Sequence, residues 1–481
     1  MLALSTVETY RSRETLLTVA LGEILVQLGM MPVVAVIPGL SAALGVGPPE
    51  GAWVLTVFML ALAGTLLVGG RLGDLLGHRR VFGWGALVYT LGSLLAGLAG
   101  GLPTLLVARG LQGVGAAMVS GNNLAILSGA IPAGHLGKAV AAVATASALS
   151  AVVGSALGTA AIAFGDWPLL FFGTAPLGLW AAVRSRRLPG LPDGRPRAPV
   201  DWAGAGLLVG CLSLVAVALN HPHGTTTETV MPLFHIALPA LAIVAAGAFV
   251  IVERRTRVPL MDWGQLCRRA FGTAIGVNSV LHLTMMASMF LGPVLVVRGL
   301  GLTTTAGGML MVVVQTSVVA TAFAGGWLYD RTAARWIRPV ALGILIAGFL
   351  AWAVSGLAGS YAALVAFGFF TGLGSGVLLA VNNVVVMQSL PDEFRGAASG
   401  MLETTRQFGH AFGVTIPTAI LALVVVSAAG QGAALEPAAL RWGFFWSCLG
   451  MAAVAALGLP LALVRAPVTP TGERGIMVTS L

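Results

Sequence analysis

The sequence predicts an all-α membrane protein that crosses the bilayer many times, with both termini in the cytoplasm. Three observations support this fold class: the composition, continuous apolar runs of helical length, and an asymmetric placement of the basic residues. Of the 481 residues, 57% are hydrophobic and only 9% are charged, whereas a soluble domain carries about 25% charged residues. So few charges cannot cover a soluble protein of this size, and the apolar excess must therefore face lipid.

The apolar runs predict helices and not strands. In hydrocarbon every backbone polar group needs an internal partner, so a spanning segment is a helix or part of a closed barrel. Barrel strands alternate apolar and polar residues, but these runs are continuous for about twenty residues, the length of a spanning helix. They predict fourteen helices, although 202–252 is alternatively an interfacial hairpin. The predicted spans are 16–40, 51–71, 80–99, 103–127, 138–163, 167–186, 202–220, 232–252, 271–296, 305–327, 338–357, 360–386, 396–426 and 442–464.

The basic residues test this count independently. With a cytoplasmic N-terminus, the inner loops and tails hold 22 of the 26 lysines and arginines, and the outer loops hold only Arg298 and Arg441. This bias follows the positive-inside rule for an even number of spans. The net charge of +9 therefore reflects short clusters between apolar runs, and not a basic face for nucleic acid. The apolar run up to Leu40 is too long for the core of a cleaved signal peptide and is interpreted as the first span.

Two parts of the sequence repeat the same motifs in the same order. Gly69–Asp74 and Gly325–Asp330 share the pattern GGxLxD, and an Asn-Asn pair follows 48 residues after Asp74 and 52 residues after Asp330. Parallel six-helix repeats are typical of transporters whose binding site lies between two halves. The predicted divisions are an N-terminal six-helix half at 1–188, a linker with an inserted helix pair at 189–257, a C-terminal six-helix half at 258–465 and a tail at 466–481.

The residues in these repeats resemble a known family. Gly70–Arg80 (GRLGDLLGHRR) is similar to the loop 2–3 signature of the major facilitator superfamily, and Arg109–Ala117 (RGLQGVGAA) is similar to its RxxQGxGAA signature in span 4. The fourteen-span layout, Val36–Pro38 in span 1 and Thr405–Gly409 in span 13 resemble the drug:H+ antiporter-2 family. The resemblance implies the major facilitator fold and proton-driven export across the cell membrane.

Two departures from the family pattern bear on the cargo. Related exporters usually carry an Asp in span 1 within LDxTxxxxALP, whereas this chain has Leu28-Gly29 when aligned on Pro38. The span 5 signature GxxxGPxxGG remains only as Gly154–Thr159, without its Pro and final Gly-Gly. Both elements are tied in the family to coupling and cation handling, so the departures argue against ordinary export of cationic drugs.

The loop after span 2 is the first candidate functional motif. The resemblance implies a cytoplasmic gate in which Asp74 pairs with an arginine or caps a facing helix. The alternative is a solvated charge cluster that serves membrane topology only. The gate candidates are Gly70, Arg71, Gly73, Asp74, Gly77, Arg79, Arg80 and, in the second repeat, Asp330.

Five ionisable residues within spans are candidates for proton coupling. Arg109 in span 4 is expected to face the bundle interior as a proton-linked switch, because a guanidinium in lipid needs a partner; alternatively it reaches to the outer interface. With the usual span 1 Asp absent, Glu23 is the candidate in the N-terminal half for proton binding or for pairing with a cationic substrate; alternatively it forms a helix-bridging hydrogen bond. Glu403, Arg406 and His410 share one face of span 13. They predict a protonation site or, alternatively, a structural Glu403–Arg406 ion pair.

Further polar and adaptable side chains are predicted to line a substrate cavity. Several are spaced on one helix face, as Asn278 and His282 are in span 9. The alternative for the polar members is hydrogen bonding between helices, and for Met286 it is packing. The candidates are Gln27, Gln112, Asn122, Asn123, Asn278, His282, Met286, Asn382, Asn383 and Gln407.

The motifs also exclude function classes. The sequence has no GxxxxGK[ST] loop and no HExxH, nucleophile-elbow or CxxC motif, so we expect neither ATP-driven transport by this chain nor an enzyme. Cys211, Cys267 and Cys448 match no metal site and are interpreted as packing residues. The leading prediction is a monomeric exporter of small hydrophobic compounds, driven by the proton gradient without a cofactor. The alternatives are a lipid or envelope-precursor flippase, a nutrient importer, or a non-transporting scaffold.

Overall fold

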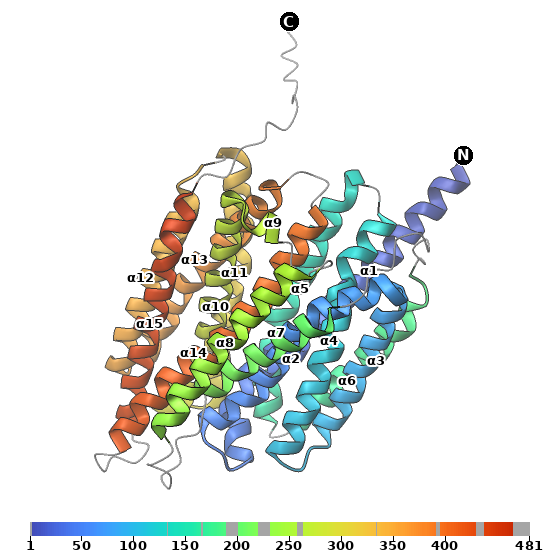
Figure 1. The fold of residues 1–481 in the computed structure, drawn as a ribbon. Coiled ribbons are helices and arrows are strands. Elements are labelled where there is room, and N and C mark those ends of the chain that lie inside the picture. Colours follow the sequence, from blue (N-terminus) through green and yellow to red (C-terminus); the bar gives the residue numbers. More distant parts are fainter. Residues whose placement is uncertain are drawn as a thin grey trace, which may run out of the picture.

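The computed structural model is a bundle of long helices that run side by side (Figure 1). It describes residues 2–131, 133–164, 167–188, 201–219, 231–256, 263–332, 334–390, 395–429 and 437–464. These residues form helices joined by turns, with no β-strand in the ranges given. The all-α prediction is therefore confirmed.

Six helices from the first part of the chain pack against one another and are called the N-terminal bundle. α1 lies against α4, α5 and α6, and α3 lies against α4 and α6. α6 begins at Pro168, whose missing N–H costs nothing in a first helical turn. The bounds are α1 (Leu2–Ala43), α2 (Pro48–Leu76), α3 (His78–Gly97), α4 (Leu102–Ala130), α5 (Ala133–Ala163) and α6 (Pro168–Ser185).

The last part of the chain forms a second group, called the C-terminal bundle. α10 lies against α14 and α15, and α13 lies against α11 and α12. α12 ends at Ala358 and is capped by Gly359, which adopts a φ of 67° in the left-handed region that favours glycine. The bounds are α10 (Arg269–Val294), the π-helical turn η1 (Leu295–Gly299), α11 (Thr304–Thr332), α12 (Ile337–Ala358), α13 (Tyr361–Gln388), α14 (Arg395–Ala429) and α15 (Pro437–Leu463).

A helix pair lies beside the seam between the bundles. α7 (Trp202–Leu219) packs against α8 (Met231–Arg255), and α7 also contacts α2 of one bundle and α14 of the other. Both helices run alongside the bundles and not across an end (Figure 1). The short α9 (Trp263–Leu266) precedes α10. This is where the sequence predicts the inserted pair, 189–257.

The lengths and apolar surfaces of the helices fit a membrane. Nine helices of the described ranges contain a segment long and apolar enough to cross a bilayer. Large apolar side chains such as Leu98, Val107 and Phe164 lie exposed on the outside of the bundle, where lipid can cover them. A multi-pass membrane protein is therefore supported, while the number of fourteen spans stays a prediction.

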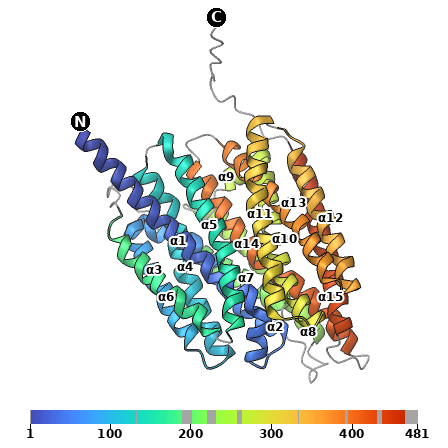
Figure 2. The ribbon, with the colours of Figure 1, turned by 180° about the vertical axis from the view of Figure 1, so that it is seen from behind.

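The two bundles touch along several helices. α1 contacts α10 and α11, α5 contacts α11, and α14 contacts both α2 and α4. α1 begins and α15 ends at the same end of the molecule (Figures 1 and 2), as an even number of passes requires. We call this the inner end, because the arginine distribution predicts it to be cytoplasmic, and we call the opposite end the outer end.

Candidate transport site

Two carboxylates and one guanidinium meet where the bundles touch. The Arg406 Nη2 atom lies 2.7 Å from Glu403 Oε2 on the same helix and 3.5 Å from Glu23 Oε2 on α1. Glu23 belongs to the N-terminal bundle, so Arg406 joins the two bundles through an ion pair. We call Glu23, Glu403 and Arg406 the interbundle cluster.

Neutral donors surround the two carboxylates. Asn123 Nδ2 donates to Glu23 Oε1 over 2.9 Å, and Gln407 Nε2 donates to Glu403 Oε1 over 2.7 Å. The Ser120 hydroxyl lies 3.2 Å from Glu23 Oε1 and 3.3 Å from Glu403 Oε1. One hydroxyl proton can serve only one of these carboxylates at a time. Ser120 of α4 can therefore donate to Glu23 of α1 or to Glu403 of α14, but not to both at once.

The charges of the interbundle cluster do not balance. With both acids ionised, two carboxylates face one guanidinium, which leaves one negative charge in excess. The Glu23 side chain is 9% exposed, Arg406 is 20% exposed and Glu403 is 22% exposed. An excess charge in a low-dielectric interior is costly, so the cluster can be neutralised by binding one proton or one cation.

A pair of histidines lies one helical turn beyond Arg406. His282 Nδ1 on α10 and His410 Nε2 on α14 are 3.1 Å apart, and their ring centroids are 5.0 Å apart. One ring must donate to the other, so the pair shares a proton. Among the described residues, His410 Nδ1 has no hydrogen-bond partner.

Arg109 lies in a different place, inside the N-terminal bundle. Its Nε atom donates to the Val54 carbonyl of α2 over 2.9 Å, its Nη1 donates to Gln112 Oε1, and its guanidinium lies 4.2 Å from the centre of the Phe58 ring. Gln112 Nε2 in turn donates to Ser93 Oγ over 2.7 Å. Arg109 is 0% exposed, so a side chain reaching the outer interface is excluded, and its partner in the neighbouring helix is a carbonyl.

The loop between α2 and α3 is tied to α4. Asp74 lies 3.5 Å from Arg71 Nη1 and 3.3 Å from His78 Nε2, and His78 Nδ1 lies 2.7 Å from Asn122 Oδ1. Asn122 also donates to the Gly69 carbonyl over 3.0 Å. Arg71 lies on the same helix as Asp74, so this ion pair does not test the predicted gate, which stays a prediction, and the sequence analysis overlooked His78. His78 lies within the motif Gly70–Arg80, four residues after Asp74, and this spacing is the signal that could have identified it.

Other members of this motif occupy the surface or the turn. Gly77 has a φ of 94°, which favours glycine between α2 and α3. Arg79 donates to the Leu188 carbonyl over 3.4 Å, and Arg80 is exposed. Gly70 and Gly73 lie where α2 approaches α4. The Asp330 side chain lies outside the described residues, so its predicted role stays a prediction.

Most remaining cavity candidates bridge helices within one bundle. Gln27 donates to Ser147 over 2.8 Å between α1 and α5, Asn278 donates to Thr405 over 3.0 Å between α10 and α14, and Asn382 donates to the Ala274 carbonyl over 3.1 Å. Met286 is buried in the core, and Asn383 is half-buried. Of the ten candidates, only Asn123 and Gln407 contact the interbundle cluster. Ser120, which sequence analysis missed, contacts it too.

The glycines that remain of the span 5 motif pack against α1. A Cβ atom added to Gly158 would lie 2.9 Å from Pro32 Cα, and one added to Gly154 would lie 3.1 Å from Met31 Cβ. Both glycines therefore let α5 approach α1 closely. The missing Pro and final Gly-Gly do not prevent this contact.

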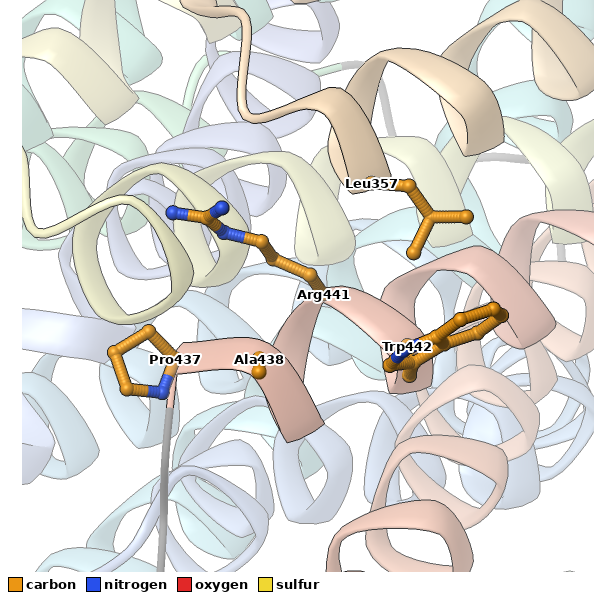
Figure 3. A pocket seen from close by; sticks show the side chains of 5 residues that line it. All are labelled: Leu357, Pro437, Ala438, Arg441 and Trp442. Atoms are coloured by element: carbon orange, nitrogen blue, oxygen red, sulfur yellow. The ribbon is translucent and has the colours of Figure 1, made fainter.

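A pocket of about 410 Å³ opens at the outer end of the C-terminal bundle (Figure 3). It lies between the last turn of α12 and the first turn of α15, and it is lined by Leu357, Pro437, Ala438, Arg441 and Trp442. None of these residues belongs to the interbundle cluster. This pocket is therefore distinct from the substrate cavity that the sequence predicts between the two halves.

Comparisons with known proteins agree with this architecture. The Major Facilitator Superfamily profile matches residues 19–414. The chain is 32% identical to the cephamycin export protein CmcT of Amycolatopsis lactamdurans, over 91% of this chain and 89% of that protein. It is 28% identical to the multidrug resistance protein Stp of Mycobacterium tuberculosis, over 88% and 77% of the two chains. Its fold is similar to the crystal structure of a bacterial homolog of the human lysosomal transporter Spinster, with a TM-score of 0.67 at 14% identity, over 94% and 96% of the two chains.

Proposed function

This chain belongs to the Major Facilitator Superfamily, and we propose that it exports small hydrophobic compounds across the cytoplasmic membrane in exchange for protons. The names of CmcT and Stp, an export protein and a multidrug resistance protein, support export. Several of the predicted polar cavity residues bond within one bundle, which leaves them unavailable to a polar substrate and supports apolar cargo such as drugs, antibiotics or self-made metabolites. The observation that carries the proposal is the interbundle cluster with its one excess negative charge.

We further propose the drug:H+ antiporter-2 arrangement of fourteen spans with both termini in the cytoplasm. The helices at 202–219 and 231–255, where the inserted pair is predicted, support it. So does the common end at which α1 begins and α15 ends. In this arrangement the N-terminal and C-terminal bundles are the two halves that move, and one chain suffices for transport.

The position of the interbundle cluster suggests how protons drive the movement. Glu403 lies eight residues into α14, or about 12 Å from its inner end. Ser120 lies in the inner half of α4. Ionised acids would hold the bundles together at this level through Arg406. A proton from the outer side would neutralise one acid, weaken the contact and favour opening of the inner end.

Substrate and proton would then alternate at one place. Opening of the inner end would release the proton to the cytoplasm and admit the substrate between the bundles. The bundles would close again around the substrate and release it on the other side. Coupling requires only that the proton and the substrate favour different arrangements of the same two bundles.

Proteoliposomes offer the test. Purified protein is reconstituted with a pH-sensitive dye inside, and proton movement is recorded after addition of chloramphenicol as an uncharged hydrophobic probe. The wild type is expected to move protons against the probe, and Glu23→Gln is expected to abolish this while keeping the Asn123 hydrogen bond. Glu14→Gln is the matched control, because Glu14 pairs with Arg184 over 2.9 Å within the N-terminal bundle only.

The same assay separates the alternatives. If the rate of probe transport were the same with and without a pH gradient, in wild type and in Glu23→Gln, proton coupling would be contradicted and a flippase favoured. Movement of the probe in the same direction as the proton would favour an importer. No movement of any probe in a panel of dyes and antibiotics would favour a scaffold.

A further inference from the structure

The outer pocket combines one cation with an apolar wall. Arg441 and Trp442 project from neighbouring positions of α15, and Leu357 at the end of α12 lies across from them (Figure 3). Arg441 is half-buried, whereas Trp442 is 50% exposed. The pocket therefore holds a positive charge beside a surface that opens outward.

Arg441 is held in place by backbone groups. Its Nε atom donates to the Gly299 carbonyl of η1 over 3.0 Å. A Cβ atom added to Gly359 would lie 3.1 Å from Arg441 Nη1, so the guanidinium also rests against the turn after α12. A backbone carbonyl is neutral, so these contacts orient the guanidinium without cancelling its positive charge. The guanidinium is thus oriented at the outer end without a partner carboxylate in the described ranges.

A second cation lies next to this site. Arg298 belongs to the same η1 turn as Gly299 and is half-buried. Arg298 and Arg441 are the two basic residues that sequence analysis assigns to the outer loops. The backbones at these two positions therefore lie close together, because Arg441 donates to the carbonyl of Gly299, the residue that follows Arg298.

Aromatic rings extend from the pocket along α15. Trp442 packs edge-on against Phe445 at 5.6 Å between ring centroids, and Phe445 packs against Trp446 at 5.6 Å. Trp446 is also about half exposed. Exposed tryptophans near a helix end are typical of the level of the lipid head groups. The apolar rings continue from this level toward the hydrocarbon, along the path of an acyl chain.

We propose that this pocket binds the phosphate head group of an anionic phospholipid from the outer leaflet. Arg441 would pair with the phosphate, Arg298 would add to the attraction, and an acyl chain would lie on the rings of α15. An arginine fork suits phosphate oxygens. The charge selects an anionic lipid over a zwitterionic one, and the aromatic surface selects a lipid over free phosphate. This site is independent of proton coupling and of the direction of transport.

Native mass spectrometry of the purified full chain tests the site. Wild type with added phosphatidylglycerol is expected to retain a lipid adduct about tenfold more strongly than with phosphatidylcholine. Arg441→Gln is expected to lose this preference, and Arg441→Lys to keep part of it. Arg331→Gln is the matched control. The Arg331 guanidinium lies 4.0 Å from the centre of the Trp327 ring at the inner end of α11, so it too is an arginine beside a tryptophan, but far from the outer pocket.

Thermal unfolding in phosphatidylcholine separates lost binding from lost folding. Arg441→Gln that unfolds as wild type does, yet binds no phosphatidylglycerol, supports the proposal. Equal binding by Arg441→Gln and wild type would overturn it, and so would equal protection of wild type by glycerol phosphate. Glu436 directly precedes Pro437 in the sequence. Binding that appears only in Glu436→Gln would show that an internal acid occupies Arg441 and would also overturn the proposal.

Discussion

Glu23 and Glu403 are held to different degrees by the same guanidinium. Glu403 lies 2.7 Å from Arg406, whereas Glu23 lies 3.5 Å away and relies on the neutral donors Asn123 and Ser120. An ion pair offsets the free energy that it costs to bury a charge, and a weak pair offsets less of it. The weakly paired carboxylate therefore gains more by binding a proton. At the scale of single residues, Glu23 is therefore the acid that we propose as the first proton acceptor.

This difference predicts unequal stability losses. Glu403→Gln removes the close partner of Arg406 and is expected to cost about 2 kcal/mol, since a partly buried guanidinium is left with one distant acid. Glu23→Gln is expected to cost less than about 1 kcal/mol. Thermal unfolding in detergent, followed by tryptophan fluorescence, measures both. Equal losses, or a larger loss for Glu23→Gln, would contradict the assignment.

Arg109 leads to a different prediction, because its contacts lie within one bundle. Arg109→Gln removes a bond to the Val54 carbonyl and the contact with Phe58. It is expected to cost about 2–4 kcal/mol of stability. The pH profile of transport should keep its shape in any protein that still folds. A shifted pH profile with unchanged thermal stability would instead support the proton-linked switch that the family resemblance implies.

At the scale of helices, α14 shows what sequence periodicity can and cannot predict. Spacing correctly groups Glu403, Arg406 and His410 on one face of a helix. It cannot reveal that this face is divided, with Arg406 meeting α1 and His410 meeting His282 of α10. Partners on other helices depend on how helices pack, and a single sequence contains no signal for such contacts.

Ser120 illustrates the same limit on α4. A serine among small residues in a spanning helix is ordinary packing material, and only its place opposite both Glu23 and Glu403 makes it part of the site. Asn123 was predicted as a cavity residue and does reach Glu23. Asn122, its neighbour, instead turns toward α2. Adjacent residues on a helix point about 100° apart, so one faces the site and the other does not.

The histidine pair gives a prediction at this scale. His282→Gln and His410→Gln each break the one hydrogen bond that the rings share, so the second substitution should add little to the first. A double-mutant cycle of thermal stability is expected to give a coupling of about 0.5–1.5 kcal/mol. Strict additivity would show that the two rings do not interact. Transport by either variant is expected to persist, because the two rings are hydrogen-bonded to each other and not to the interbundle cluster.

At the scale of the whole molecule, composition and arginine placement were sufficient to predict an all-helical membrane protein. Predicted boundaries such as 338–357 agree closely with α12 (Ile337–Ala358), because apolar length is fixed by the bilayer. Span 1 was predicted from residue 16, but α1 begins at Leu2. Polar residues before a span can continue its helix into water, where hydropathy gives no signal for the helix end.

The assembly of the two bundles was predictable only in outline. The repeated motifs indicate two related halves, and the structure brings α1, α4 and α14 together at their seam. The meeting of Glu23 with Arg406, which are far apart in the sequence, follows from that assembly and from no local pattern. We propose that ionised acids in the interbundle cluster keep the bundles together toward the inner end.

A spin-label distance between the bundles tests this claim most directly. Ser128 near the inner end of α4 and Arg335 between α11 and α12 are both exposed. They can carry labels as Ser128→Cys and Arg335→Cys once Cys211, Cys267 and Cys448 are replaced. We expect a longer distance at pH 5 than at pH 8, and the longer distance already at pH 8 in Glu23→Gln. One unchanged distance in all three samples, or the same shift produced by Glu14→Gln, would contradict it.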